Sequence, residues 1–197
     1  MSSPALAATI TVTTASDDIT PNDGSVALRE AIAAINAGNN LGDPDITAEN
    51  PGTFGSGDNI RFNIPGSSPV TIHVGTDAIA SHIALPQLTN PATIDATTQA
   101  GTGTVRVVLD GTSAGATAVG LSLGAAATIK GFDIEHFSGD GILLASGAST
   151  ISGNYIGVGP SGPTGATAAA NGTGIVAASG GNTISGNTIS GNTADGV

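Results

Sequence analysis

The sequence predicts an all-β protein folded as a parallel β-helix, a solenoid in which each turn of the chain forms one coil of short strands. A repeated motif, Thr-Ile-x-Gly-x-x-Ile, is the first of three observations and begins at Thr128, Thr150 and Thr183. A glycine followed by an aliphatic residue is the second, at Gly120, Gly141, Gly174 and Gly196. The third is composition and patterning: 30 of the 197 residues are glycine, and short segments between them alternate apolar and polar residues.

The two markers set the expected coil length at about 22 residues, because such a period is typical of stacked repeats that bury a shared core. The motif copies are 22 and 33 residues apart, and the longer interval contains the Gly- and Pro-rich stretch 157–168. We expect this stretch to loop out of one coil. A weaker pair, Thr71-Ile72 and Thr93-Ile94, also has the 22-residue spacing. Residues 59–197 are therefore predicted to form the β-helix, with about six coils stacked about 4.8 Å apart.

Residues 1–58 are predicted to hold an N-terminal strand, a helix and connecting loops. The stretch 9–14 alternates threonine with apolar residues, as a strand does. Ser25 is the expected N-cap of an amphipathic helix over 26–37, and Gly38 is expected to end it in a left-handed conformation. Both ends of a solenoid expose unpaired strand edges, so this helix is the natural cap for the N-terminal end.

Charge and cysteine content argue against several classes of protein. Four Lys and Arg against fifteen Asp and Glu give a formal net charge of -11, which opposes binding to nucleic acid or anionic lipid. The absence of cysteine removes disulfide scaffolds, cysteine zinc sites and thiol catalysis. No apolar stretch reaches the roughly 20 residues of a membrane span, and residues 5–7 (Ala-Leu-Ala) have the pattern that ends a secretory signal.

Residues 26–32 read Val-Ala-Leu-Arg-Glu-Ala-Ile and resemble the Cys-Ser-Leu-Arg-Glu-Ala-Ile signature near the start of many large bacterial surface proteins, the CSLREAI-motif proteins. Val26 and Ala27 replace Cys and Ser, and the other five residues match. Similar stretches lie at 10–14, 58–66, 93–99, 108–111, 137–142 and 153–157. The resemblance implies a right-handed parallel β-helix in an exported, adhesin-like or matrix-like protein, of which this chain is the N-terminal region. The family has no uniform activity, so the resemblance assigns none.

An enzyme that acts on polysaccharides is the alternative function that a parallel β-helix allows. A hydrolase needs two positioned carboxyl groups, and the best local candidates are Asp133 and Glu135, with His136 and Asp140 nearby in sequence. Strand alternation places Asp133 and Glu135 on one outward face with Ile134 inward, but outward strand positions are usually polar in any case. The repeat motifs of polygalacturonases and pectate lyases are not recognisable.

Lyase chemistry and carbohydrate binding have few candidate residues. A lyase needs a basic group, and the cations of the chain are Arg29, Arg61, Arg106 and Lys130. Arg29 is expected to form a structural pair with Glu30 in the helix. A binding module usually stacks sugars on aromatic rings, and the aromatic residues are Phe54, Phe62, Phe132, Phe137 and Tyr155. Phe62 and Phe132 are expected in the core. Antifreeze proteins with a β-solenoid fold order water on flat faces that carry regular threonine arrays. Here the Thr-x-Thr spacing occurs mainly in 9–14, not once per coil, which argues against ice binding.

Calcium is the metal ion that the sequence could bind. Hard oxygen donors lie in two clusters, one formed by Asp17, Asp18, Asn22 and Asp23 and the other by Asp43 and Asp45. Neither cluster has the spacing of a known calcium loop, and Asp and Asn also cap turns by bonding their own backbone. The three histidines, His73, His82 and His136, show no metal-ligand spacing.

We therefore expect a non-enzymatic extracellular protein: a β-helical stalk, adhesin or matrix fibre component located at the cell surface. Regular coils give a stiff rod, and Asn154 and Asn187, at the same repeat position, are expected to pair their amides from coil to coil. Expected partners are the rest of a longer chain or further copies at the solenoid ends, with cell-surface or polysaccharide contacts. The enzyme or carbohydrate-binding module stays the alternative.

Overall fold

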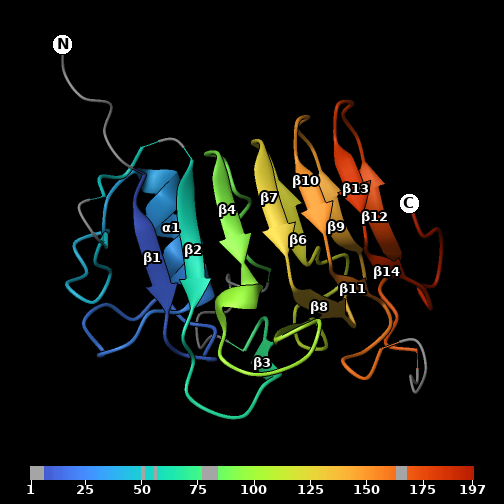
Figure 1. Cartoon of the computed structure of the whole chain (residues 1–197), viewed down its shortest axis with the longest axis horizontal. Helices are drawn as coiled ribbons and strands as arrows, with labels where there is room; N and C mark the ends of the chain where they lie inside the picture. Colours follow the sequence, from blue (N-terminus) through green and yellow to red (C-terminus); the bar gives the residue numbers. More distant parts are fainter. Residues whose placement is uncertain (1–6, 50–51, 56, 77–83, 163–167) are drawn as a thin grey trace.

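Three sheets, each made only of parallel strands, step side by side along the length of the molecule and make it a parallel β-solenoid (Figure 1). The computed structural model describes residues 7–49, 52–55, 57–76, 84–162 and 168–197. The first sheet has the order β1 (Thr9–Val12), β2 (Asp58–Phe62), β4 (Ala92–Asp95), β7 (Ala127–Lys130), β10 (Thr150–Ser152) and β13 (Thr183–Ser185). The prediction of stacked parallel strands is thereby confirmed.

The other two sheets complete the coils. The second sheet has the order β3 (Val70–His73), β5 (Val107–Asp110), β8 (Phe132–Glu135), β11 (Tyr155–Ile156) and β14 (Thr188–Ile189). The third sheet consists of β6 (Leu121–Leu123), β9 (Asp140–Leu144) and β12 (Thr173–Ala177). A short 3-10 helix, η1 (Ala96–Thr98), and one α-helix, α1 (Leu28–Ala37), are the helical elements of the described residues.

The repeat markers coincide with the strand register in the C-terminal half. Thr128 pairs with Thr150, and Thr150 pairs with Thr183, so the 22- and 33-residue spacings of the motif are the lengths of two consecutive coils. The extra 11 residues lie between β11 and β12, where an insertion was predicted at 157–168. Residues 163–167 of that insertion lie outside the described residues.

The 22-residue period is wrong for the N-terminal coils. Thr71 pairs with Val108 in the second sheet, whereas Thr93 lies in the first sheet, so the two are not equivalent positions. Asn59 pairs with Thr93 and Thr93 with Thr128, at separations of 34 and 35 residues. Strand pairing fixes only the spacing between coils, and long corner loops lengthen these coils without disturbing it. Within the described residues, five strands of the first sheet follow residue 57, not six.

A column of isoleucines forms the spine of the core. The central residue of each first-sheet strand points inward, and register aligns them as Ile10, Ile60, Ile94, Ile129, Ile151 and Ile184. All are at most 1% exposed except Ile184, which is only partly buried in the last coil. Burial of one such side chain contributes about 1.5–3 kcal/mol, so the column alone is a large part of the hydrophobic stabilisation.

The outward positions of the same sheet carry a row of polar side chains, five of which are threonine. Register aligns Thr9, Asn59, Thr93, Thr128, Thr150 and Thr183 in one line across the sheet. The expectation that the Thr-x-Thr spacing does not occur once per coil is confirmed, because among the strands of this sheet only β1 contains it. The recurrence of single threonines was hidden in the sequence by the unequal lengths of the coils before Thr128.

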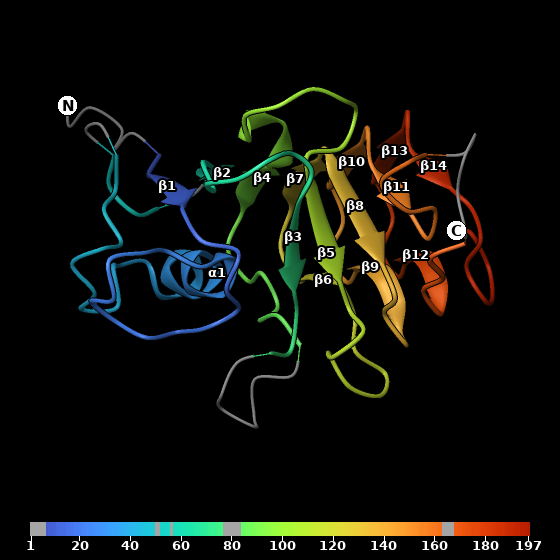
Figure 2. The ribbon, with the colours of Figure 1, turned by 90° about the horizontal axis from the view of Figure 1, so that it is seen from below.

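Helix α1 lies at the N-terminal end of the stack, against β1 and β2 (Figures 1 and 2). It begins at Leu28, and its N-cap is Ala27 rather than the expected Ser25. The Glu30 carboxylate accepts a hydrogen bond from the Ala27 N–H at 2.8 Å, which satisfies one donor of the first turn. Gly38 ends the helix at φ 66°, as expected. Seven of its ten residues are buried, so the whole helix belongs to the core.

A column of glycines sets how closely consecutive coils approach. A Cβ atom on Gly120 would lie 2.5 Å from the carbonyl oxygen of Gly141, and one on Gly141 would lie 2.7 Å from that of Gly174. A Cβ atom on Gly174 would in turn lie 2.4 Å from the oxygen of Gly196. The second sequence marker therefore reflects a position at the start of the third-sheet strands at which only glycine fits between backbones.

Replacing Gly141 by alanine should lower the free energy of unfolding by about 1–3 kcal/mol, because the added methyl group overlaps the Gly174 backbone and Ile156. Gly180→Ala is the matched control, since nothing lies within 4 Å of the Cβ position there. Its effect should stay within about 0.5 kcal/mol. Thermal or chemical unfolding of both variants measures the difference, and equal effects would show that the column does not limit coil spacing.

Candidate functional site

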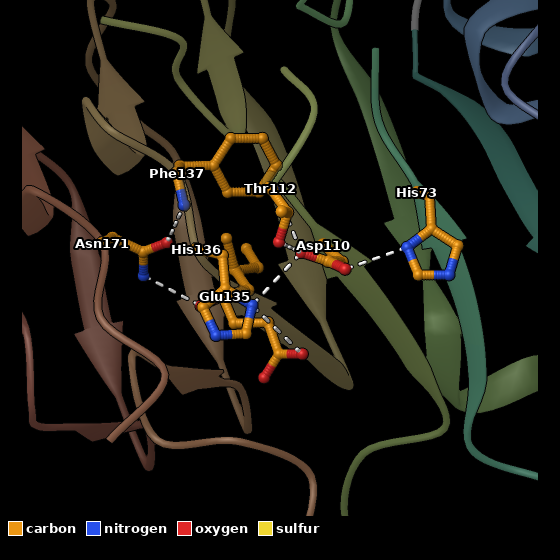
Figure 3. Close-up of polar contacts among 8 residues, drawn as sticks. His73, Asp110, Thr112, Glu135, His136, Phe137 and Asn171 are labelled. Carbon is orange, nitrogen blue, oxygen red and sulfur yellow. Dashed lines mark hydrogen bonds and ion pairs between the residues drawn. The ribbon is translucent and has the colours of Figure 1, made fainter. Parts of the chain in front are cut away.

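The outward face of the second sheet gathers the most concentrated group of ionisable side chains in the described structure. Strand register places His73 of β3 beside Asp110 of β5, and Asp110 beside Glu135 of β8. Because neighbouring strands lie about 4.8 Å apart, the three side chains form one row. Asp133 lies two residues before Glu135 on the same face of β8. His136 follows β8 directly and lies beside Glu135 and Asp110 (Figure 3).

Asp110 is the centre of this row. Its Oδ1 accepts hydrogen bonds from the Thr112 N–H at 3.0 Å and the Thr112 hydroxyl at 2.6 Å. His73 Nδ1 lies 2.9 Å from Oδ2, and His136 Nδ1 lies 3.2 Å from Oδ1. Partial burial acts to raise the pKa of Asp110, but the bonds from Thr112 and the two histidines outweigh it and lower the pKa. Asp110 is thus held as a carboxylate.

The two histidines are oriented by that carboxylate. Each uses Nδ1 toward Asp110, so each leaves Nε2 free, and in Figure 3 the two Nε2 atoms point away from each other. His136 has φ 61°, a conformation that is uncommon for a residue with a Cβ and that sets the direction of its ring. His136 Nδ1 is also 3.8 Å from Glu135 Oε1. His82 lies outside the described residues.

Asp133 and Glu135 face outward from β8, as strand alternation predicts, with Ile134 in the core. Both are nevertheless buried: Asp133 is 0% exposed and Glu135 is 9% exposed. On one side Tyr155 of β11 lies beside Asp133, on the other Val108 of β5 does, and the Gly159 backbone also approaches Asp133. Gly157, Gly159 and Gly162 all have positive φ, which lets the chain reverse there.

Burial changes the acidity of the pair. Desolvation raises the pKa of Asp133 from 3.8 to about 8, and the neighbouring Glu135 charge adds to the effect. Desolvation also raises the pKa of Glu135, while the His136 ring acts in the opposite direction. Asp140, expected nearby, instead begins β9 in the third sheet, where its carbonyl accepts a bond from the Gly120 N–H.

This group of residues can hold and move protons. Three hollows of the described surface lie away from it. One is bordered by β1 and residues 24–26 and 45–49, another lies at the C-terminal end of α1, and a third lies between residues 84–87 and 116–122.

The first calcium candidate, Asp17, forms a buried ion pair. Its oxygens accept bidentate bonds from Arg29 Nε and Nη2, each at 2.7 Å, and Oδ2 also accepts the Gly75 N–H at 2.6 Å. Arg29 therefore pairs with Asp17 and not with Glu30, because Glu30 turns back to the N-terminus of its own helix. Arg29 Nη1 donates to the Ala84 carbonyl, which completes the connection between helix and coil.

The other calcium candidates lie in two loops that the fold brings side by side. The Asn22 N–H donates to Asp43 Oδ1 at 3.1 Å, and the Gly24 N–H donates to Asp45 Oδ2 at 2.7 Å. Asp23 and Asp18 accept bonds within their own loop, from Ser25 and Thr20 respectively. These are the turn-capping contacts that were the alternative reading of the loops. Among the described residues, no three His, Asp or Glu side chains are arranged to hold a metal ion, and calcium binding stays a prediction.

The remaining candidates have structural contacts. Lys130 pairs with Asp95 across adjacent strands at 2.9 Å, and Arg106 Nη1 donates to the carbonyls of Thr97 and Gln99. Phe62 and Phe132 are in the core, as expected, with ring centroids 5.5 Å apart in an edge-to-face contact. Phe137 is also buried, which leaves Phe54 and Tyr155 as the partly exposed aromatic rings.

Comparisons of this chain with protein-family models, curated proteins and solved structures found no match. Within the described part of the chain, no helix has both the length and the apolar character needed to cross a bilayer. The function is therefore proposed from the residues and their arrangement alone.

Proposed function

We propose that this chain is a structural module of an extracellular protein, a β-helical stalk, adhesin or matrix fibre component, and not an enzyme. The single observation that carries the proposal is the way the coils are joined: buried asparagine side chains link neighbouring coils in the C-terminal half of the solenoid. We further propose that the β-helix is right-handed and that α1 caps its N-terminal end, in keeping with the resemblance of residues 26–32 to bacterial surface proteins.

Two asparagine ladders support the structural role. Asn154 Nδ2 donates to Asn187 Oδ1 at 3.0 Å, which confirms the predicted pairing of these two residues. Asn171 Nδ2 donates to Asn192 Oδ1 at 3.1 Å at another corner, where no pairing was predicted. Both Asn154 and Asn171 are at most 1% exposed. Stacked amides of this kind tie neighbouring coils, and the Asn154 and Asn171 members of the two pairs are buried.

The surface properties are compatible with an exposed, load-bearing rod. A net charge of -11 opposes binding to nucleic acid, and this part of the proposal rests on composition. Among the described residues, β13 and β14 are the last strands of their sheets, whereas Gly174 and Ile175 of β12 donate to the carbonyls of Asp195 and Gly196, each at 2.9 Å. We propose that the edges of β13 and β14 pair with further coils of a longer chain or with another copy, because unpaired edges favour strand addition.

A polysaccharide-active enzyme or carbohydrate-binding module is the second candidate, and the row of Asp110, Glu135 and His136 is the observation that favours it. A histidine oriented by one carboxylate beside a carboxyl group with a raised pKa is a combination suited to acid–base catalysis. It ranks second because buried asparagine side chains that connect neighbouring coils support the structural proposal directly.

A reducing-end assay on a panel of plant, fungal and bacterial polysaccharides decides between the two candidates. We expect no cleavage by the purified chain, and no difference between the native chain and Glu135→Gln. Glu49→Gln is the control, since Glu49 lies outside the row and bonds Thr11 at its own end of the solenoid. Cleavage that is lost in Glu135→Gln and kept in Glu49→Gln would overturn the structural proposal in favour of the enzyme.

A further inference from the structure

We propose that the C-terminal end of the described solenoid is a docking surface for a polypeptide segment that carries three asparagines at intervals of five residues. Such a segment adds one further coil, and its side-chain oxygens accept three backbone N–H groups of this end. The inference deepens the structural role proposed above and rests on it, because it names the partner of the β13 and β14 edges.

The corner between the first and second sheets shows how one coil recognises the next. The Phe132 N–H donates to Asn154 Oδ1 at 3.0 Å, and Phe132 and Asn154 hold the same repeat position in consecutive coils. One coil further along, the Asn154 N–H donates to Asn187 Oδ1, also at 3.0 Å. A backbone N–H of each coil therefore bonds a side-chain oxygen of the coil that follows it.

The other two corners repeat this bond. Between the second and third sheets, the Phe137 N–H donates to Asn171 Oδ1 at 3.1 Å, and the Asn171 N–H donates to Asn192 Oδ1 at 3.2 Å. Between the third and first sheets, the successive acceptors are Ser149 Oγ at 3.1 Å and Asn182 Oδ1 at 2.9 Å. In the last coil the acceptor at every corner is thus an asparagine.

The backbone of the last coil leaves three donors of this kind unused. Within the described part of the chain, no group accepts a hydrogen bond from the N–H of Asn182, Asn187 or Asn192. The equivalent N–H groups of the two preceding coils all have side-chain acceptors, as given above. The end of the stack therefore presents a triangle of N–H donors, one at each corner.

The apolar core is also incompletely covered at this end. Register aligns Ile184 with Ile151 and Ile189 with Ile156. Ile151 and Ile156 are 0% exposed, whereas Ile184 and Ile189 are only partly buried. A further coil that bonds the three corners covers this surface at the same time, and burial of apolar area favours docking.

The spacing of the asparagines in the last coil defines the partner. The tripeptide Gly-Asn-Thr begins at Gly181, Gly186 and Gly191, so its asparagines are five residues apart. These glycines have φ values of 79°, 64° and 75°, which turn the chain at each corner. A segment with the same spacing can place one amide above each unused N–H group.

A second folded copy does not present such acceptors. At its N-terminal end, α1 lies against β1 and β2, and the Thr9 carbonyl already accepts the Glu49 N–H at 2.9 Å. Two C-terminal ends placed face to face would oppose N–H donors with N–H donors at the corners. The partner is therefore an extended segment that takes up its coil on docking, as in strand addition.

Titration of the nitrogen-15-labelled full chain with a synthetic peptide, followed by NMR, tests the proposal. The peptide has the sequence of residues 181–197, and its matched control carries Asn182→Ala, Asn187→Ala and Asn192→Ala. With the asparagine peptide, the three unused N–H signals should move downfield. At about ten times the Kd, their exchange with solvent should slow about tenfold. The signals of Ser149, Asn154 and Asn171, which already have acceptors, should keep their positions.

Three results would overturn the proposal. Unchanged signals at millimolar peptide would show that this end takes no further coil. Equal binding of the alanine peptide would show that the strand edges suffice and that the asparagines are not recognised. Signals that move with protein concentration alone, together with a doubled mass in analytical ultracentrifugation, would identify a second copy as the occupant. The titration contains no polysaccharide, so a negative result refutes this partner and leaves the structural role to the reducing-end assay.

Discussion

Asp17→Ala should lower the free energy of unfolding by about 3–5 kcal/mol. The Arg29 guanidinium is 2% exposed and loses both of its 2.7 Å bonds to Asp17, which leaves a buried charge without a partner. The Gly75 N–H loses its acceptor as well. Equilibrium unfolding in urea, followed by circular dichroism, measures the loss.

Two further variants separate the ion pair from general damage to the loop. Asp23→Ala removes a carboxylate whose bonds go only to Ser25, in the same loop, and should cost about 1 kcal/mol or less. The double variant Asp17→Ala, Arg29→Met should be more stable than Asp17→Ala alone, because no charge remains buried. A loss in Asp17→Ala that is no larger than the loss in Asp23→Ala would contradict the structural role of the pair.

Asn154→Ala should lower the free energy of unfolding by about 2–6 kcal/mol, since two buried backbone groups lose their partners at about 1–3 kcal/mol each. The Phe132 N–H loses its bond to Asn154 Oδ1 at 3.0 Å, and the Ile129 carbonyl loses its donor at 3.1 Å. The amide link to Asn187 in the next coil is lost at the same time. Chemical unfolding of the purified variant gives the value.

Asn187→Ala is the matched control for the ladder. Asn187 occupies the same repeat position one coil further along, but it is only half-buried, so water can replace its bonds. Its loss should be clearly smaller than that of Asn154. Equal losses would mean that burial within the ladder does not determine its contribution to stability.

The parts of the fold that the sequence predicted are those in which coil length is regular. From Thr128 onward, equivalent residues follow one another at 22 or 33 positions, so the motif revealed the register directly. Before Thr128, the coils contain loops of differing length, and β1 pairs with β2 across 50 residues that include α1. No spacing in the sequence marks those pairs, because loop length does not affect the contacts that hold the strands together.

Only those residues of the candidate site that are close together in the sequence could be predicted. The others come from coils of unequal length, so no spacing in the sequence marks them. Asp133, Glu135 and His136 are neighbours in sequence, whereas His73 and Asp110 come from earlier coils and reach the row through register alone. Each of β3, β5 and β8 ends with an ionisable residue directly after an inward aliphatic one, at His73, Asp110 and Glu135. This shared strand ending is the signal that an alignment of strands, rather than of fixed periods, could have found.

The pairing of Thr150 with Thr183 across a longer coil has a consequence for how such a chain can vary. The advance along the axis is about 4.8 Å per coil, whether the coil contains 22 residues or 33. Corners can therefore gain, lose or exchange segments while the row of outward threonines keeps its pitch. The spacing of the stacked strands is constant, whereas the length of the corner loops varies. Loops can therefore be added or changed at a chosen coil without altering the packing of the strands beneath them.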